Sequence, residues 1–142
     1  MDGMTGIYQH SIDAKGRLFI PARLRDELGE VFHVTLSMEQ KCLWAFPAES
    51  WVKFNEKIKA MPIAKQVKMR PFFSHAARCE LDGQGRILLS QSLRDFRELK
   101  KNVTIVGAGE RAEFWDADAF AIKDAQETTP ENIADVFTEF DI

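Results

Sequence analysis

The sequence has few of the residues that build metal centres or disulfide frameworks. Its 142 residues include two cysteines and three histidines, scattered rather than placed at the short spacings of a metal site. Cys42 and Cys79 suit the reduced thiols of a cytosolic protein, and a single bond between them is the less favoured alternative. We therefore expect no metal and no other cofactor.

Long apolar runs are missing as well. No stretch approaches the roughly 18 residues that a membrane-spanning helix needs. Residues 1–12 lack the basic segment and following apolar stretch of a secretory signal. With 45% hydrophobic and 29% charged residues, the composition is that of a globular protein. The sequence thus predicts a cytoplasmic protein without a membrane partner.

Positive charge is outnumbered over the whole chain but not in every part of it. The net charge is −3, yet residues 1–101 carry 17 Lys and Arg against 12 Asp and Glu, a net of +5. Residues 102–142 carry 2 against 10, a net of −8. A positive field therefore belongs to the first two thirds of the chain, where it would suit a nucleic acid. A protein with a solvated acidic tail and no such partner would carry the same charges.

The first part of the sequence recurs in the second at a constant offset of 69 residues. Asp13–Arg17 (DAKGR) aligns with Asp82–Arg86 (DGQGR), and Leu24–Asp26 aligns with Leu93–Asp95. The alignment continues without a gap for about 40 residues, which indicates an internal duplication.

The sequence pattern of each copy predicts two strands, a helix and two further strands, in the order β-β-α-β-β. The expected strands are residues 7–12, 17–20, 31–36, 43–46, 78–81, 86–89, 103–106 and 112–115. A helix should begin at Pro21 and stop at Gly29 in the first copy, and begin near Ser90 or Ser92 in the second. A unit of about 45 residues is too small to bury its own core well. We therefore expect an α+β fold in which two tandem units interleave their strands as a pseudo-twofold swapped-hairpin barrel.

Four segments follow from this interpretation. They are a first repeat, a helical linker, a second repeat and an acidic helical tail, at residues 4–51, 52–76, 77–120 and 121–142. In the linker, apolar side chains at three- and four-residue steps predict one helix ending at Pro62. A second helix is expected over residues 64–76, kinked or shortened by Pro71. The linker's aromatic stripe favours core or subunit packing over a cofactor pocket.

The two Asp-x-x-Gly-Arg turns carry the candidate chemistry. The last glycine of each loop can take the positive φ that a three-residue hairpin with a bulge requires. The turn-shaping residues are then expected to be Asp13, Gly16, Asp82 and Gly85. The aspartate would also aim the arginine at its end of the loop. The plainer alternative is a turn aspartate with a surface ion pair worth only about 0–1 kcal/mol.

Arginine suits guanine and phosphate because its planar fork donates two parallel hydrogen bonds. We predict that Arg17 and Arg86 contact nucleic acid, with Lys15 adding a charge at the first loop, where the second has Gln84. A second basic layer would come from Arg25 and Arg94, for which an ion pair or a helix-surface role is an equal alternative.

At these residues the sequence resembles a known family. Asp13–Arg25 follows the pattern DxKGRLxIPxxLR and Asp82–Leu88 follows DxxGRIL, which is similar to the MraZ family. The looser pattern resembles AbrB-type swapped-hairpin transition-state regulators and antitoxins. Val106–Gly109 and Glu113–Asp116 also resemble the second half of MraZ proteins. The resemblance covers about residues 4–122.

Two positions depart from the family pattern. Ser90 stands where the family often has proline, and Pro71 lies in the linker helix. The paired Asp and Arg motifs match by position, and Lys15 matches the family's usual basic loop residue.

The resemblance implies a cytoplasmic, nucleoid-associated transcription factor that forms ring-like homo-oligomers at the promoter of the division and cell-wall gene cluster. We expect sequence-specific binding to double-stranded DNA with repeated short boxes, and repression rather than activation. The alternatives are an RNA-binding or protein-interaction module. An enzyme is disfavoured because the sequence shows neither a nucleophile with a base nor a metal cluster, and no small-molecule substrate is expected.

Overall fold

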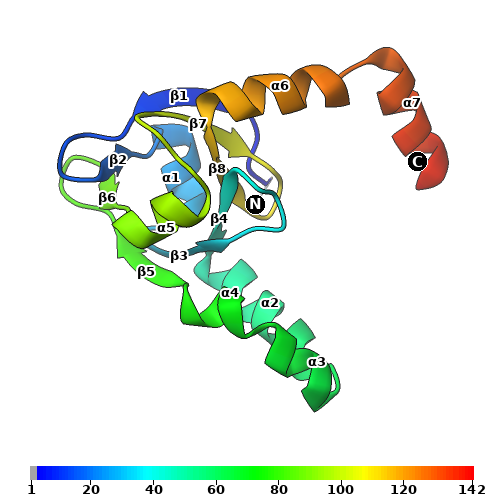
Figure 1. Ribbon diagram of the computed structural model, residues 1–142, viewed down its shortest axis with the longest axis horizontal. Helices are drawn as coiled ribbons and strands as arrows, with labels where there is room; N and C mark the ends of the chain where they lie inside the picture. Colours follow the sequence, from blue (N-terminus) through cyan, green and yellow to red (C-terminus); the bar gives the residue numbers. More distant parts are fainter. Residues whose placement is uncertain (1–2) are drawn as a thin grey trace.

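The computed structural model describes residues 3–142 and has a mixed α+β fold (Figure 1). The strands are β1 (Ile7–Ser11), β2 (Arg17–Phe19), β3 (Val31–Leu36), β4 (Cys42–Pro47), β5 (Ala77–Glu80), β6 (Arg86–Leu88), β7 (Asn102–Gly107) and β8 (Ala112–Asp116). The helices are α1 (Ala22–Leu28), α2 (Ala48–Lys59), α3 (Ile63–Lys68), α4 (Arg70–Ser74), α5 (Gln91–Phe96), α6 (Ala117–Glu127) and α7 (Pro130–Glu139).

The strands of the two sequence copies are interleaved. Six of them form an antiparallel sheet in the order β1-β7-β8-β4-β3-β5, and β2 pairs with β6 in a separate two-stranded ribbon. The first strand of each copy therefore leaves its own copy. β1 pairs with β7 of the second copy, and β5 pairs with β3 of the first. Both repeats thus contribute to one sheet.

The expected barrel is not found as a closed structure. Within residues 3–142, β1 and β5 form the two free edges of the six-stranded sheet. The remaining strands of the described residues are β2 and β6. Each has three residues, and they pair with each other alone. The strand exchange is therefore present without closure of a barrel.

Side chains that alternate along the strands divide the core into two faces. On β4, Leu43 and Ala45 join the larger apolar cluster, which also holds the buried leucines of α1 and α5. Their neighbours Trp44 and Phe46 face the opposite side, with Trp115 of β8. Aromatic residues of α2 and α6 cover this second face. A period of two along the strand is what a sheet buried on both faces requires.

Proline and serine set the helix ends largely where the sequence predicts. Pro21 is the N-cap of α1, which ends before Gly29. The Ser90 hydroxyl caps α5 by accepting a hydrogen bond from the Leu93 amide, at 3.3 Å. The expected second linker helix is divided into α3 and α4, and Pro71 lies in the first turn of α4. Proline breaks the helix because its nitrogen has no hydrogen to donate.

The C-terminal region forms two helices. α6 packs on the sheet through Phe120, whose ring centroid lies 5.6 Å from that of Trp115. α7 has no buried residue and extends away from the sheet (Figure 1). Across the described part of the chain, no helix is both long and apolar enough to cross a membrane.

Candidate nucleic-acid interface

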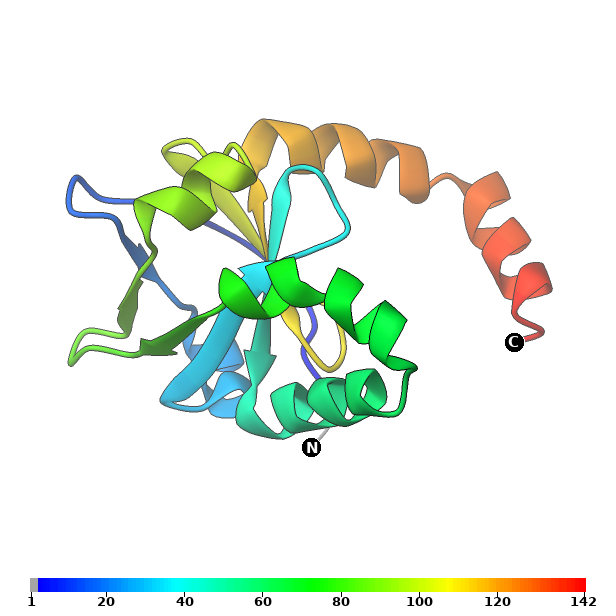
Figure 2. The same cartoon turned by 60° about the horizontal axis from the view of Figure 1, so that its bottom comes forward.

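The two Asp-x-x-Gly-Arg turns lie together at one end of the molecule. Figure 2 shows the β1–β2 loop in blue and the β5–β6 loop in green, both on the side opposite α7. We call Asp13–Arg17 tip 1 and Asp82–Arg86 tip 2. The acidic C-terminal helix therefore lies away from the tips of its own chain.

Tip 1 is a tight turn held by its aspartate. The Gly16 amide donates to the Asp13 carbonyl at 3.0 Å, and Gly16 has a φ of 83°. The Oδ1 atom of Asp13 accepts hydrogen bonds from the amides of Lys15 and Arg17, both at 2.9 Å. The carboxylate thus fixes the loop backbone on both sides of the glycine.

Tip 2 repeats this geometry. Gly85 has a φ of 76°, and its amide donates to the Asp82 carbonyl at 3.1 Å. Asp82 Oδ1 accepts from the amides of Gln84 and Arg86, at 2.8 and 3.0 Å. The aspartate and the glycine thus have the same geometry at both tips.

Each aspartate also holds its arginine. Asp13 Oδ2 accepts from Arg17 Nε at 2.7 Å, and Asp82 Oδ2 accepts from Arg86 Nε at 3.0 Å. Among residues 3–142, the terminal Nη1 and Nη2 atoms of both arginines have no hydrogen-bond partner. A planar pair of donors at the end of each side chain is therefore available to bind a base edge or a phosphate.

The turn backbone keeps the aspartates charged. The amide of Arg17 lowers the pKa of Asp13, and the amide of Arg86 lowers that of Asp82, in each case with help from the arginine side chain. A hydrogen bond donated to a carboxylate favours its charged form. At neutral pH both carboxylates are ionised, so that they orient the guanidinium groups by charge as well as by geometry.

The tips are joined to each other across the two copies. The Ile20 amide donates to the Gly85 carbonyl, and the Leu89 amide donates to the Gly16 carbonyl, both at 2.9 Å. Arg86 Nη1 also lies 3.9 Å from Asp13 Oδ2. Because the β2–β6 pairing continues these bonds, the two arginines are presented as a pair from one ribbon.

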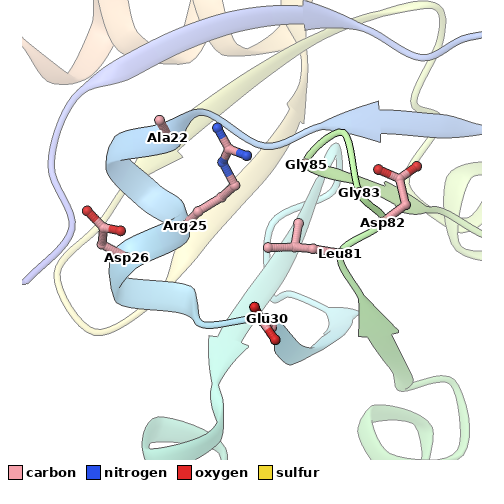
Figure 3. A pocket seen from close by; sticks show the side chains of 8 residues that line it. All are labelled: Ala22, Arg25, Asp26, Glu30, Leu81, Asp82, Gly83 and Gly85. Carbon is pink, nitrogen blue, oxygen red and sulfur yellow. The ribbon is translucent and has the colours of Figure 1, made fainter.

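Arg25 and Arg94, the predicted second basic layer, each lie beneath the tip of the other copy. Arg94 of α5 lies beneath tip 1, where a Cβ added to Gly16 would be 2.9 Å from Arg94 Nη2. Arg25 of α1 lies in the same way beneath Gly85, and Figure 3 shows it extending from the helix toward that loop. The repeat offset predicts the equivalence of these arginines. It does not predict that each supports the tip of the other copy.

The two supporting arginines are not equally bonded. Arg94 Nε donates to the Leu89 carbonyl at 3.2 Å. Arg25 Nε is buried and has no partner, although its guanidinium lies 5.2 Å from the centre of the Phe19 ring. A cavity of about 570 Å³ lies beside Arg25 and tip 2 (Figure 3). The carboxylates of Asp26, Glu30 and Asp82 line it, so that a phosphate would be repelled there.

The tips also differ in exposed charge. Lys15 is exposed at tip 1, and the neutral Gln84 is exposed at tip 2. Arg17 and Arg86 are about one third and one quarter exposed, at 32% and 25% of the side chain. Four of the five predicted binding residues therefore lie on or under the loops as partly buried groups, and the fifth, Lys15, is exposed.

Cys42 and Cys79 are free thiols, and both are buried. Burial raises the pKa of the Cys79 thiol to about 11, and it also raises that of Cys42. Nucleophilic attack requires the thiolate, which such thiols do not supply at neutral pH. Within residues 3–142, no three His, Cys, Asp or Glu side chains are grouped to hold a metal ion. The interface offers hydrogen-bond donors and positive charge.

Comparison with known proteins identifies relatives along almost the whole chain. The family model described as "MraZ protein, putative antitoxin-like" matches twice, at residues 4–70 and 72–136. A protein of Heliobacterium modesticaldum named "Transcriptional regulator MraZ" is 44% identical over 142 residues, covering 96% of this chain and 98% of the relative. One of the same name from Carboxydothermus hydrogenoformans is 51% identical over 113 residues, covering 78% of each chain.

Among solved structures, the solution structure of PHS018 from Pyrococcus horikoshii covers 81% of this chain and 96% of its own. It is 14% identical with a TM-score of 0.34, and at this distance nothing about this chain follows from it.

Proposed function

Because this chain belongs to the MraZ family, we propose that it is a transcriptional regulator that binds double-stranded DNA through tip 1 and tip 2 together. The observation that carries this proposal is the pair of aspartate-held arginines at one end of the molecule. Within residues 3–142 the terminal nitrogens of both donate no hydrogen bond, and both arginines belong to one ribbon. Oriented hydrogen-bond donors and positive charge are suited to binding a nucleic acid.

The basic residues of the two tips have different roles in this proposal. Arg17 and Arg86 donate to base edges or phosphates, and Lys15 adds a charge contact at tip 1. Arg25 and Arg94 form the layer beneath, where they support the loops and bring positive charge close to the DNA backbone. The exchange of strands between the copies supports a swapped-hairpin arrangement, in which neither tip can be placed without the other copy.

The family relationship extends the proposal to the whole regulator. It acts in the cytoplasm on the nucleoid as a sequence-specific repressor of the division and cell-wall gene cluster, which includes its own gene. It assembles as a ring-shaped homo-oligomer on repeated short boxes. The two tips of one chain make weak contacts with DNA. An assembly binds DNA more tightly, because tethered sites bind at high effective concentration.

The test compares two double variants that each remove two positive charges. Arg17→Ala/Arg86→Ala loses the tip arginines, whereas Lys68→Ala/Arg70→Ala loses charges of the linker. Affinity for the DNA upstream of the protein's own gene is measured by fluorescence anisotropy at several salt concentrations. We expect the tip variant to bind more weakly and to reduce the slope of log K against log salt by about 0.9 for each phosphate that it no longer neutralises. The linker variant should keep both the affinity and the slope.

An unchanged affinity and slope in the tip variant, with molar mass preserved, would exclude the tips as the DNA contact. Competition by unrelated RNA as strong as that by the upstream duplex would instead favour an RNA-binding module.

A further inference from the structure

The outer face of the β2–β6 ribbon carries apolar side chains as well as arginines. The pairing register places Arg17 opposite Leu88 and Phe19 opposite Arg86. Residues directly opposite each other in an antiparallel pair lie on the same face. The middle residue of each strand is buried in the core, so that these four side chains share the other face. The ribbon therefore presents two rows, each made of one arginine and one apolar side chain.

The two apolar side chains of the ribbon differ in how they are covered. The Phe19 ring lies 5.0 Å from the His10 ring, between centroids, and the Arg25 guanidinium lies 5.2 Å from its centre. Leu88 is the equivalent of Phe19 at the repeat offset of 69 residues, and it is 65% exposed. Where the first copy has His10, the second has the buried Cys79. Leu88 is thus the apolar side chain of the ribbon that is accessible to a ligand.

The position of Leu88 gives its exposure a meaning. A single exposed leucine is common on protein surfaces and by itself indicates no function. Leu88, however, is paired with Arg17, and the Cβ atoms of such opposite residues are about 4.5–5.5 Å apart. If Arg17 binds DNA, as the proposed function holds, Leu88 is carried to the same part of the DNA. The inference drawn from this position rests on that proposed function.

The dimensions of the ribbon suit the major groove. This groove of B-DNA admits a two-stranded β-ribbon. The two rows are two residues apart along each strand, or roughly 6.8 Å, which is about two base-pair steps of 3.4 Å. Each row would therefore face a different base pair. In the row of Arg17 and Leu88, the arginine suits the acceptors of guanine, and the leucine needs an apolar partner.

We infer that Leu88 contacts the C5-methyl group of a thymine adjacent to the base that Arg17 binds. This methyl is the apolar group that natural bases present in the major groove. The contact would add a preference for thymine that the arginines do not supply, since they bind hydrogen-bond acceptors. It belongs to the second copy alone, because Phe19 in the first copy is covered by its own chain.

The test removes the methyl group from the DNA and the leucine from the protein. Synthetic duplexes of the upstream site are prepared in which one thymine of the bound box is replaced by uracil, which lacks only the methyl. Each thymine is replaced in turn. A methylated cytosine carries the same group, and synthetic duplexes contain none, so that thymine is the only source. Affinities of the wild type and of Leu88→Ala are measured by fluorescence anisotropy.

Two further variants serve as controls. Ile63→Ala shortens an apolar side chain of the linker that is 70% exposed, far from the ribbon in the sequence. Arg17→Ala/Arg86→Ala reports whether the tips bind DNA at all. Circular dichroism and sedimentation velocity show that each variant keeps its fold and its molar mass. If Leu88→Ala perturbs either one, Leu88→Gln, which is similar in length and polar at its end, replaces it.

We expect uracil to weaken binding of the wild type by about 4-fold at one thymine of the box, the factor that corresponds to burial of one methyl-sized group. At the other thymines the change should be small. Leu88→Ala should bind the thymine and the uracil duplex equally at that position, because the contact is already lost. Ile63→Ala should keep the preference of the wild type.

Two results would overturn the inference. The wild type could bind every uracil duplex as tightly as the thymine duplex, or Leu88→Ala could keep the full preference for thymine. A lower molar mass of Leu88→Ala with the preference kept would assign Leu88 to a contact between subunits.

The double arginine variant separates this failure from failure of the proposed function. If it loses binding while uracil has no effect on the wild type, only the contact of Leu88 is wrong. If it binds as tightly as the wild type, the tips do not bind DNA, and both proposals fail.

Discussion

Tip 1 and tip 2 have the same turn but different surroundings. In both, an aspartate accepts from two loop amides and from the arginine Nε, and a glycine takes a positive φ. Around tip 1, the supporting arginine is bonded to a backbone carbonyl and an exposed lysine adds charge. Around tip 2, the supporting arginine Nε is unpartnered, an acidic cavity lies alongside, and the lysine is replaced by glutamine. The two copies therefore share the backbone geometry of the turn and differ in the charges around it.

The glycines offer the largest expected difference between the tips. Gly16→Ala and Gly85→Ala both place a Cβ at a positive φ, which costs about 1–2 kcal/mol. At Gly16 the new methyl would also lie 3.2 Å from the Leu89 carbonyl oxygen, which is backbone and cannot turn away. At Gly85 the three nearest atoms all belong to the end of the Arg25 side chain, which can turn away. We expect Gly16→Ala to reduce the free energy of unfolding by about 1 kcal/mol more, measured by urea unfolding. Equal reductions would mean that the two loops are supported alike.

The supporting arginines should differ by a smaller amount. Arg94→Ala removes a hydrogen bond to Leu89 and the group beneath Gly16, whereas Arg25→Ala removes a buried nitrogen that has no partner. A net hydrogen bond contributes about 0.5–1.5 kcal/mol, and removing an unsatisfied polar atom offsets part of the destabilisation. Thermal and urea unfolding should therefore rank Arg25→Ala as the milder change. A larger destabilisation by Arg25→Ala would contradict the proposed difference between the two supporting arginines.

The charge difference can be exchanged between the tips. Lys15→Gln should weaken DNA binding several-fold, and Gln84→Lys should strengthen it, because the number of neutralised phosphates falls by one at tip 1 or rises by one at tip 2. The slope of log K against log salt should change by about 0.9 in opposite directions. Anisotropy titrations of both single variants and of the double exchange measure this. An unaffected slope in Lys15→Gln would remove Lys15 from the interface.

The smallest effect is expected from pH. The folded turns lower the pKa of Asp13 and Asp82 below the ordinary value of 3.8. A carboxylate whose pKa is lowered by folding stabilises the fold at pH values above its pKa in the unfolded chain. This contribution is lost as the pH falls through its pKa in the folded protein. The wild type should therefore have a higher free energy of unfolding than Asp13→Asn or Asp82→Asn, by a constant amount near neutral pH. This difference should disappear below about pH 4. Unfolding curves across this range, with NMR titration of the carboxyls, measure it. A gap that widens in acid would contradict the lowered pKa.

Local chemistry is what the sequence predicts well. The Asp–Gly–Arg turns, the proline start of α1 and the Ser90 cap each depend on a few adjacent residues. All are present in the structure. The offset of 69 residues likewise predicts the interleaved α+β arrangement, because two small units must share a core.

What the sequence does not predict depends on contacts between distant segments. No local pattern places Arg25 beneath Gly85 rather than beneath the glycine of its own copy. Closure of a barrel depends on strand length at the edges, and the three-residue β2 and β6 do not supply it. The apolar face of α7 is visible in the sequence, but its exposure is known only from the packing of α6.

The most direct test of the central claim is photo-crosslinking from the tips. Ala14 is exposed, and its equivalent Gly83 has open space and a backbone conformation that accepts a side chain, so that a benzophenone residue can replace either one. Ile63 in the linker, 70% exposed, is the control position. With the upstream duplex bound, we predict crosslinks to DNA from positions 14 and 83 and none from position 63. Crosslinks from the linker with none from either tip would contradict the account.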